Sequence, residues 1–158
     1  MMVARFHIRL AGAEDLAGVV ALELATPEAP HWAEAEYAAI VGESLGGVRR
    51  CLFVALDEDR LFGFAVGKVP GAGLEAELES VAVSVDARRL GVGGALCAAV
   101  IEWCRGQGAG AVELEVRASS GGAIALYTGM GWVEVGRRRA YYRDPADDAL
   151  LMRLELAA

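Results

Sequence analysis

The sequence has 158 residues, of which 55% are hydrophobic and 23% charged, a composition that can bury a core and that excludes a disordered chain. Its 22 acidic residues outnumber its 15 basic ones, and the net charge of −7 lacks the basic field of a nucleic-acid-binding protein. With no apolar run of membrane-spanning length and no signal-peptide pattern, we expect one domain over residues 1–158 that is soluble, cytoplasmic and without a membrane partner.

The cysteines and histidines favour neither a disulfide framework nor a metal site. Cys97 and Cys104 lie on one predicted helix, about 10 Å apart along its axis. This separation exceeds the reach of a disulfide, so we predict packed thiols. His7 and His31 are far apart in the sequence, and no CxxC pair occurs. The sequence therefore predicts no metal.

The first half of the chain alternates between strand-like and helix-like patterns. A first strand is followed by a helix with acidic residues in its first turn, and two prolines then interrupt the helical pattern. A second helix and two strands follow, and Asp57-Glu58-Asp59 is a natural hairpin turn between these strands. The predicted elements are strand Val3–Arg9, helix Ala13–Ala25, break Thr26–His31, helix Ala33–Leu45, and strands Arg50–Leu56 and Leu61–Val69.

The strand that begins at Glu75, after a turn over Pro70–Gly73, changes the face that carries its apolar residues. Its odd-numbered positions are acidic up to Glu79 and are valines from Val81 onward. A regular strand keeps its faces, so this change predicts a β-bulge near Glu79–Val81. A bulge here could leave backbone groups free to meet an extended ligand.

A glycine-rich turn follows and leads directly into a helix, whose apolar residues Leu96, Ala99, Val100 and Trp103 recur at helical spacing. The first turn of a helix has unpaired N–H groups, glycines let an anion approach them, and arginines add positive charge. The pattern favours a site for a pyrophosphate. The alternative is a connection that binds nothing. The turn comprises Arg88, Arg89, Leu90, Gly91, Val92, Gly93, Gly94 and Ala95.

After this helix, a loop, a clearly alternating strand, a short helix and two final strands complete the chain. Strands interleaved with helices predict an α/β (α+β) domain around a mixed sheet. The predicted ranges are loop Arg105–Gly110, strand Val112–Val116, helix Gly122–Met130, and strands near Val133–Tyr142 and Leu150–Leu156.

Two motifs carry a resemblance to a known family. Arg88-x-x-Gly91-x-Gly93 resembles the acetyl-CoA motif of the GNAT acetyltransferases, and Leu114–Tyr142 is similar to the RimI branch, the ribosomal-protein-alanine N-acetyltransferases. The resemblance covers roughly Leu78 to Leu156. It implies a mostly antiparallel sheet of about seven strands flanked by about four helices. It also implies that acetyl-CoA is the co-substrate.

Two residues then become candidates for catalysis. Glu115 lies on the predicted strand opposite the valines, and Tyr127 follows on the next helix. From spacing alone, they are a solvated acid and a half-buried aromatic residue. The resemblance implies instead that Glu115 is the general base for the amine and Tyr127 the general acid for the departing thiolate.

The resemblance also nominates residues for the cofactor arm. The strand segment Val81, Ala82 and Val83 would pair with the pantetheine arm and supply backbone donors for the oxyanion. The family's Ser-Asn pair reads Ser119-Ser120 here, so the shorter Ser120 side chain is expected to replace the Asn only in part.

The acceptor is expected to be a protein N-terminus, specifically the N-terminal alanine of a small-subunit ribosomal protein. By resemblance, Trp32, Tyr141 and Tyr142 line its slot. The run Arg137–Arg143 could instead be a solvated edge strand. Two other functions stay open: acetylation of a small-molecule amine, because this fold accepts many acceptors, and a non-catalytic module that binds acyl-CoA.

Overall fold

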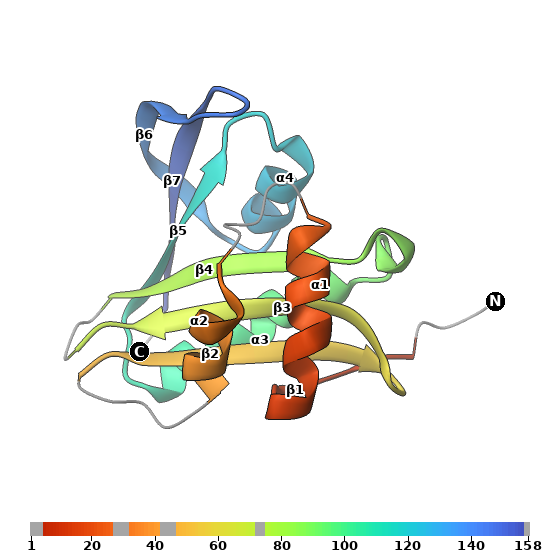
Figure 1. Cartoon of the computed structure of the whole chain (residues 1–158). Helices are drawn as coiled ribbons and strands as arrows, with labels where there is room; N and C mark the ends of the chain where they lie inside the picture. The colour runs from red at the N-terminus through yellow and green to blue at the C-terminus, as the bar shows by residue number, and fades with distance from the viewer. Residues whose placement is uncertain (1–4, 27–31, 42–46, 72–74, 157–158) are drawn as a thin grey trace.

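The computed structural model describes residues 5–26, 32–41, 47–71 and 75–156 of the chain. These residues form one seven-stranded sheet in the order β1-β2-β3-β4-β5-β7-β6, in which only β4 and β5 are parallel (Figure 1). The predicted mixed, mostly antiparallel sheet is therefore confirmed. The strands are β1 His7–Leu10, β2 Arg49–Asp57, β3 Arg60–Val69, β4 Glu75–Val83, β5 Ala111–Arg117, β6 Val133–Tyr142 and β7 Asp147–Glu155.

Four α-helices in the described residues cover the two faces of this sheet. They are α1 Leu16–Leu24, α2 Glu34–Val41, α3 Val92–Gly106 and α4 Gly121–Gly129. In Figure 1, α1 and α2 lie in front of the sheet and α3 lies behind it. Two buried clusters result, one under α3 that α4 extends, and a smaller one under α1 and α2.

The predicted bulge in β4 is confirmed. Gly67 of β3 pairs with Leu78, whereas the preceding Val66 pairs with Ser80, so Glu79 is the extra residue. The faces of the strand exchange at this point. Leu78 packs in the cluster under α3, while Ala82 packs in the cluster under α1 and α2.

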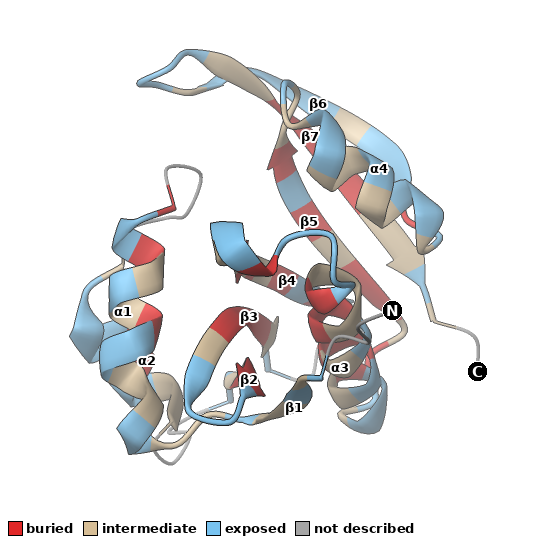
Figure 2. Cartoon of the chain, turned by 90° about the vertical axis from the view of Figure 1, so that its right-hand side faces the viewer, coloured by how far each residue is buried: buried red, intermediate tan, exposed pale blue. Residues whose placement is uncertain are grey.

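Beyond the bulge, β4 and β5 separate. They pair only from Glu75 to Glu77, against Ala111 to Glu113, whereas β5 pairs with β7 along its whole length. The paired end is held by Arg153 of β7, whose Nη1 lies 2.7 Å from Glu75 Oε1. Figure 2 shows β5 and β7 diverging from β4. The sheet is thereby split into two parts that stay joined at one end.

Several element boundaries differ from those predicted, and some predicted segments fall outside the described residues. Asp15 accepts hydrogen bonds from the Gly12 N–H and from Arg9, so residues 13–15 form a 3-10 turn and α1 begins only at Leu16. The first strand begins at His7, and α3 continues to Gly106 into the predicted loop. Pro30-His31, Leu45 and Ala72-Gly73 lie outside the description.

The helix α3 packs closely against β3. A Cβ atom on Gly67 would lie 2.7 Å from Val100 Cγ1, so only glycine allows this approach. Cys97 and Cys104 are free and buried in the core, as predicted, and Cys51 is free and buried in the same core. Burial raises the pKa of Cys51 and of Cys97 to about 12, and that of Cys104 to about 11. Among the described helices, none has the length and apolarity that a membrane crossing requires.

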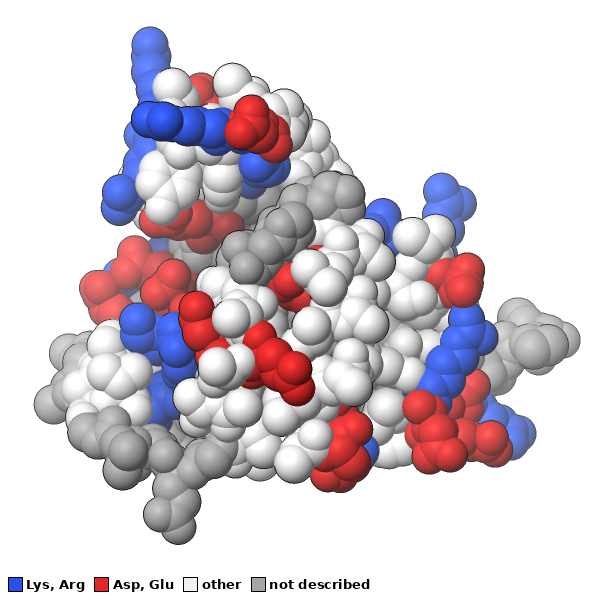
Figure 3. Space-filling model, in the orientation of Figure 1, with Lys and Arg blue, Asp and Glu red and all other residues white. Residues whose placement is uncertain are grey.

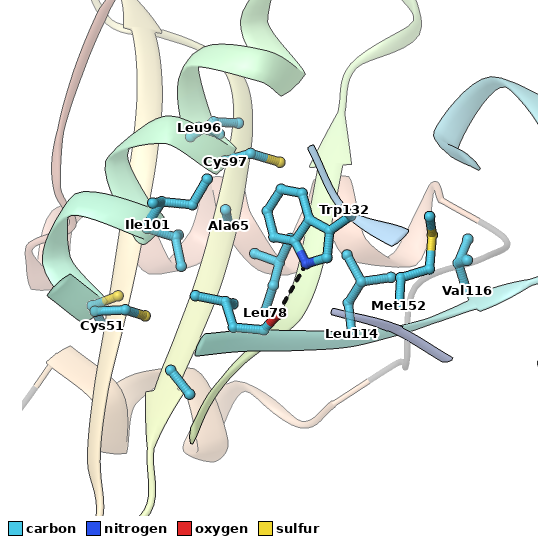
Figure 4. Close-up of a cluster of buried hydrophobic side chains, with 14 of the residues drawn as sticks. Cys51, Ala65, Leu78, Leu96, Cys97, Ile101, Leu114, Val116, Trp132 and Met152 are labelled. Carbon is cyan, nitrogen blue, oxygen red and sulfur yellow. Dashed lines mark hydrogen bonds between the residues drawn. The ribbon is translucent and has the colours of Figure 1, made fainter. Parts of the chain in front are cut away.

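Trp132 joins α4 and the second part of the sheet to the core. Its indole is 1% exposed and lies between Cys97 on one side and Leu114 and Met152 on the other (Figure 4). The indole Nε1 donates a hydrogen bond to the Val112 carbonyl oxygen at 3.1 Å. Trp132 therefore contributes both apolar burial and a satisfied buried donor.

We predict that Trp132→Phe lowers the free energy of unfolding by about 2 kcal/mol, because it loses buried volume and leaves the Val112 carbonyl oxygen without this donor. Urea unfolding followed by circular dichroism measures the change. Val133→Ala, at a side chain that is 60% exposed, is the neighbouring control and should change stability by less than about 0.5 kcal/mol. Equal stability of Trp132→Phe and the parent would contradict the role of this contact.

Candidate active site

The separation of β4 and β5 opens a cavity of about 830 Å³. The strands supply its two walls, the N-terminus of α3 one end, and α4 part of its remaining lining. Most of the predicted site residues meet here. Those that line the cavity are Val81, Ala82, Val83, Arg88, Arg89, Gly91, Val92, Gly93, Gly94, Glu115, Ser120, Tyr127 and Tyr142, whereas Leu90, Ala95, Trp32 and Tyr141 do not.

The turn before α3 has the backbone shape of an anion site. Arg89 and Gly91 have φ values of 65° and 83°, in the left-handed region that Gly91 adopts without strain. The chain then enters α3, a helix of 15 residues, whose first N–H groups face the cavity end. Arg88 and Arg89 are exposed beside it. A pyrophosphate would find helix N–H groups, glycine backbone and two guanidinium groups together.

The edge of β4 offers backbone groups to an extended ligand. From Leu78 onward, the described part of β4 is paired with β3 but no longer with β5. Val81–Val83 therefore line the cavity with one strand edge unpaired. An extended amide-containing arm can pair with this edge like an added strand.

A loop between β5 and α4 closes the same side of the cavity. Ser119 donates from its N–H and its hydroxyl to Asp147 Oδ2 of β7, at 3.1 and 2.5 Å. Ser120 stands at the N-cap of α4 without a side-chain capping bond. Its hydroxyl is on the cavity lining, where it can bind a ligand.

Glu115 projects from β5 toward the cavity on the face away from the α3 core. Its side chain is 30% exposed, and Oε1 lies 3.7 Å from Arg138 Nε of β6. The negative charge of Glu115 and a side-chain hydrogen bond to it raise the pKa of Tyr141. The carboxylate is thus placed between a basic and a phenolic side chain and remains accessible to a cationic ligand.

Tyr127 reaches the cavity from α4. Its ring contacts Trp132 edge to face, with 5.6 Å between centroids. Burial is the main cause that raises the pKa of Tyr127, with smaller contributions from Cys97 and Tyr142. The hydroxyl therefore stays protonated at neutral pH and is a hydrogen-bond donor to whatever the cavity holds.

The β6–β7 hairpin brings both tyrosines to the same region. Neighbouring side chains of a regular strand point to opposite faces, yet the rings of Tyr141 and Tyr142 touch at 5.1 Å. The register of β6 shifts between Arg138 and Tyr142, and Ala140 has a φ of 51°. The Arg117 guanidinium then covers the Tyr142 ring at 4.2 Å.

The run Arg137–Arg143 has internal partners on this hairpin. Arg137 pairs with Asp148 at 3.0 Å, and Arg138 pairs with Glu115. Figure 3 shows basic side chains gathered on the upper lobe, with acidic side chains below them. Two of these arginines therefore organise the hairpin and the acid beside it.

One residue of the cavity lining had little signal in the sequence, and one predicted residue, Trp32, is not part of the lining. Thr26, at the end of α1, lines the cavity, and only its place before the prolines marks it. Trp32 lies behind the lining on the α2 side, where the Arg50 guanidinium is 5.5 Å from its ring centroid. Arg50 also forms an ion pair with Glu79, the bulged residue on the cavity wall.

Comparison with known proteins agrees with this geometry. The acetyltransferase (GNAT) family matches residues 16–132. The [ribosomal protein bS18]-alanine N-acetyltransferase of Escherichia coli is 35% identical over 128 residues, which are 80% of this chain and 82% of that protein.

Solved structures give the same result. The crystal structure of the ribosomal-protein-S18-alanine N-acetyltransferase from Escherichia coli superposes with a TM-score of 0.82 at 32% identity, covering 98% of this chain and 96% of that one. Ard1 from Thermoplasma volcanium has a TM-score of 0.82 at 27% identity, with 98% and 100% covered. The predicted family is confirmed: the chain belongs to the acetyltransferase (GNAT) family, which uses acetyl-CoA, and is an acyltransferase of the N-acetyltransferase class.

Proposed function

We propose that this chain is one catalytic domain that transfers an acetyl group from acetyl-CoA to the α-amine of a protein N-terminus in the cytoplasm, with an N-terminal alanine of a ribosomal protein as acceptor. The observation that carries the proposal is the single cavity at which the anion cradle, the β4 edge, Glu115 and Tyr127 meet. The 35% identity to ribosomal-protein-alanine N-acetyltransferases supports the acceptor.

The cofactor fits the cavity by the chemistry of its lining. The turn from Arg88 to Gly94 would hold the pyrophosphate, and Val81–Val83 with Ser120 would hold the pantetheine arm. When bound there, acetyl-CoA supplies an activated acetyl thioester. The chain's part is to fix this group in the gap between β4 and β5 and to supply backbone donors where negative charge develops on oxygen.

Glu115 would receive the proton that the acceptor must lose. A terminal α-amine has a pKa of about 8, so a sizeable fraction is already neutral at pH 7.5 and the carboxylate has only to complete the deprotonation. Arg138 and Tyr141 hold the carboxylate in place from the hairpin side. The acidic group also attracts the ammonium form of the amine before reaction.

Tyr127 would act on the leaving side. Because burial raises its pKa, the hydroxyl is neutral and is a weaker acid than a free tyrosine. A thiol has a pKa of about 8.5, so complete proton transfer from Tyr127 to a thiolate is uphill by more than about 1.5 pK units. Its main role is then to donate a hydrogen bond to the sulfur as negative charge develops.

The cradle is tested by Gly93→Asp. A Cβ atom on Gly93 makes an ordinary contact of 3.4 Å with Leu126, so the fold accommodates the side chain, while its carboxylate enters the anion site. We predict that the affinity for acetyl-CoA falls at least about tenfold, measured by calorimetry. Gly106→Asp, in open space at the other end of α3, is the matched control. Equal affinities of the two variants would remove the cradle from the proposal.

The role of Tyr127 is tested by Tyr127→Phe, which deletes one hydroxyl and keeps the ring that contacts Trp132. We predict a fall in kcat of about 10²-fold with an almost unchanged melting temperature. Steady-state thioester turnover and thermal unfolding provide the two readouts. A kcat within about twofold of the parent would show that Tyr127 serves only packing.

The acceptor is tested with matched peptides at pH 7.5. One peptide has a free N-terminal alanine, and its partner is blocked at the N-terminus and has an internal lysine. We predict that kcat/KM favours the free terminus by at least about 10²-fold, because a lysine pKa of about 10.4 leaves far less neutral amine. Equal rates, or turnover confined to small amines, would contradict the N-terminal acceptor and favour a small-molecule acetyltransferase. No turnover with any amine would favour a binding module.

A further inference from the structure

Glu23 is a carboxylate buried in a place where the reaction does not use it. It lies on α1, one residue before the end of the helix, and is 0% exposed. Its Oε1 accepts a hydrogen bond of 2.7 Å from the backbone N–H of Trp32. Burying a carboxylate is unfavourable unless hydrogen bonds replace those it made with water. The hydrogen bond from Trp32 compensates for part of this cost.

The core under α1 and α2 also contains a second buried polar group, the hydroxyl of Tyr37. Neither Glu23 Oε2 nor the Tyr37 hydroxyl has a hydrogen bond of normal geometry. Burial is the main cause that raises the pKa of Tyr37, and the negative charge of Glu23 adds to it. Glu23 thus binds the backbone of Trp32, while Tyr37 packs against the Trp32 ring.

The Trp32 ring is held between two other side chains. The ring of Tyr37 lies 5.5 Å from it at an angle of 44°, and Tyr37 itself packs edge to face on Phe64 of β3. The Arg50 guanidinium lies 5.5 Å from the Trp32 ring centroid. Backbone and ring are thus fixed by separate contacts, and the indole has a defined position at the end of α2.

Arg50 connects Trp32 to a residue that lines the cavity. The Arg50 guanidinium pairs with both carboxylate oxygens of Glu79, at 2.9 and 3.0 Å. Glu79 is the bulged residue of β4 and lines the cavity. On the other side, Thr26 lines the cavity three residues after Glu23. Glu23 thus binds the backbone of Trp32, and Trp32 is connected to the cavity wall through Arg50 and Glu79.

We propose that Glu23 is a positioning residue for the acceptor: by holding Trp32 against Tyr37 and Arg50, it sets the affinity for the acceptor without touching the reacting atoms. This proposal rests on the proposed acetyltransferase function. It differs from a purely structural role, in which loss of Glu23 would change stability and leave the acceptor KM unaltered.

The decisive variant is Glu23→Met, which keeps the volume of the side chain and removes both its charge and its acceptor. Replacing a buried charge by an apolar group of similar size is often neutral for stability, so this variant separates folding from function. We predict that the KM for the N-terminal alanine peptide rises at least about tenfold, while the affinity for acetyl-CoA changes less than about twofold.

Two comparisons sharpen this test. Glu23→Gln keeps an oxygen that accepts the Trp32 N–H and should recover a KM within about threefold of the parent. Val19→Ala removes buried apolar volume from the same helix, at 0% exposure, and keeps the Glu23 side chain that binds the Trp32 N–H. It should lower stability and leave KM within about twofold of the parent value.

A measurement independent of acetylation examines the contact itself. Protein labelled with 15N-tryptophan has three tryptophans, and hydrogen exchange of the Trp32 amide can be followed separately. In Glu23→Met this amide should exchange at least about tenfold faster, and in Glu23→Gln nearly as in the parent. Unchanged exchange in Glu23→Met would overturn the proposal, as would faster exchange with an unchanged KM.

A double-mutant cycle with Trp32→Ala tests whether Glu23 acts through this residue. If it does, Glu23→Met should raise KM less than about twofold in the Trp32→Ala background. A full tenfold effect in that background would overturn the proposal. If the parent acetylates no peptide N-terminus, the proposed function fails, and the same cycle is run with whichever amine the parent accepts, alongside amide exchange.

Discussion

Strands β4 and β5 are parallel neighbours over only three residue pairs, after which β5 follows β7 and leaves β4. Arg153 holds the closed end through Glu75, and the bulge at Glu79 turns the free part of β4. A continuous sheet would pair the backbone edge at Val81–Val83 with β5 and would leave no gap between the two strands. The gap instead places this edge and Glu115 at one cavity, which the α3 N-terminus closes. Each proposed role in catalysis depends on this separation.

Side chains connect both walls of the gap to the rest of the protein. On the β5 side, Ser119 binds Asp147 and Arg117 covers the Tyr142 ring. These contacts join the loop between β5 and α4 to the β6–β7 hairpin. On the β4 side, Arg50 connects Glu79 to Trp32. Contacts on each side therefore connect residues proposed to bind the cofactor with residues proposed to bind the acceptor.

The sequence predicts features whose cause is local and misses those whose cause is distant. The turn before α3 is visible in the sequence because its backbone conformation favours glycine. The exchange of faces at Glu79 is visible because it interrupts the alternation of a strand. Glu23 leaves none: an acid on a short helix looks solvated until Trp32, nine residues later, is seen to donate to it. The contact between the Tyr141 and Tyr142 rings likewise depends on the shifted register of β6, which alternation alone would not indicate.

The state of the three cysteines bears on the chemistry in a different way. Acetyl transfer from acetyl-CoA keeps a thioester close to the protein, and a protein thiolate could take the acetyl group from it and release the free thiol. Cys51, Cys97 and Cys104 are buried, with pKa values raised to about 12, 12 and 11, so hardly any thiolate exists at neutral pH. The buried thiols are thereby protected from taking up the acetyl group of the bound thioester.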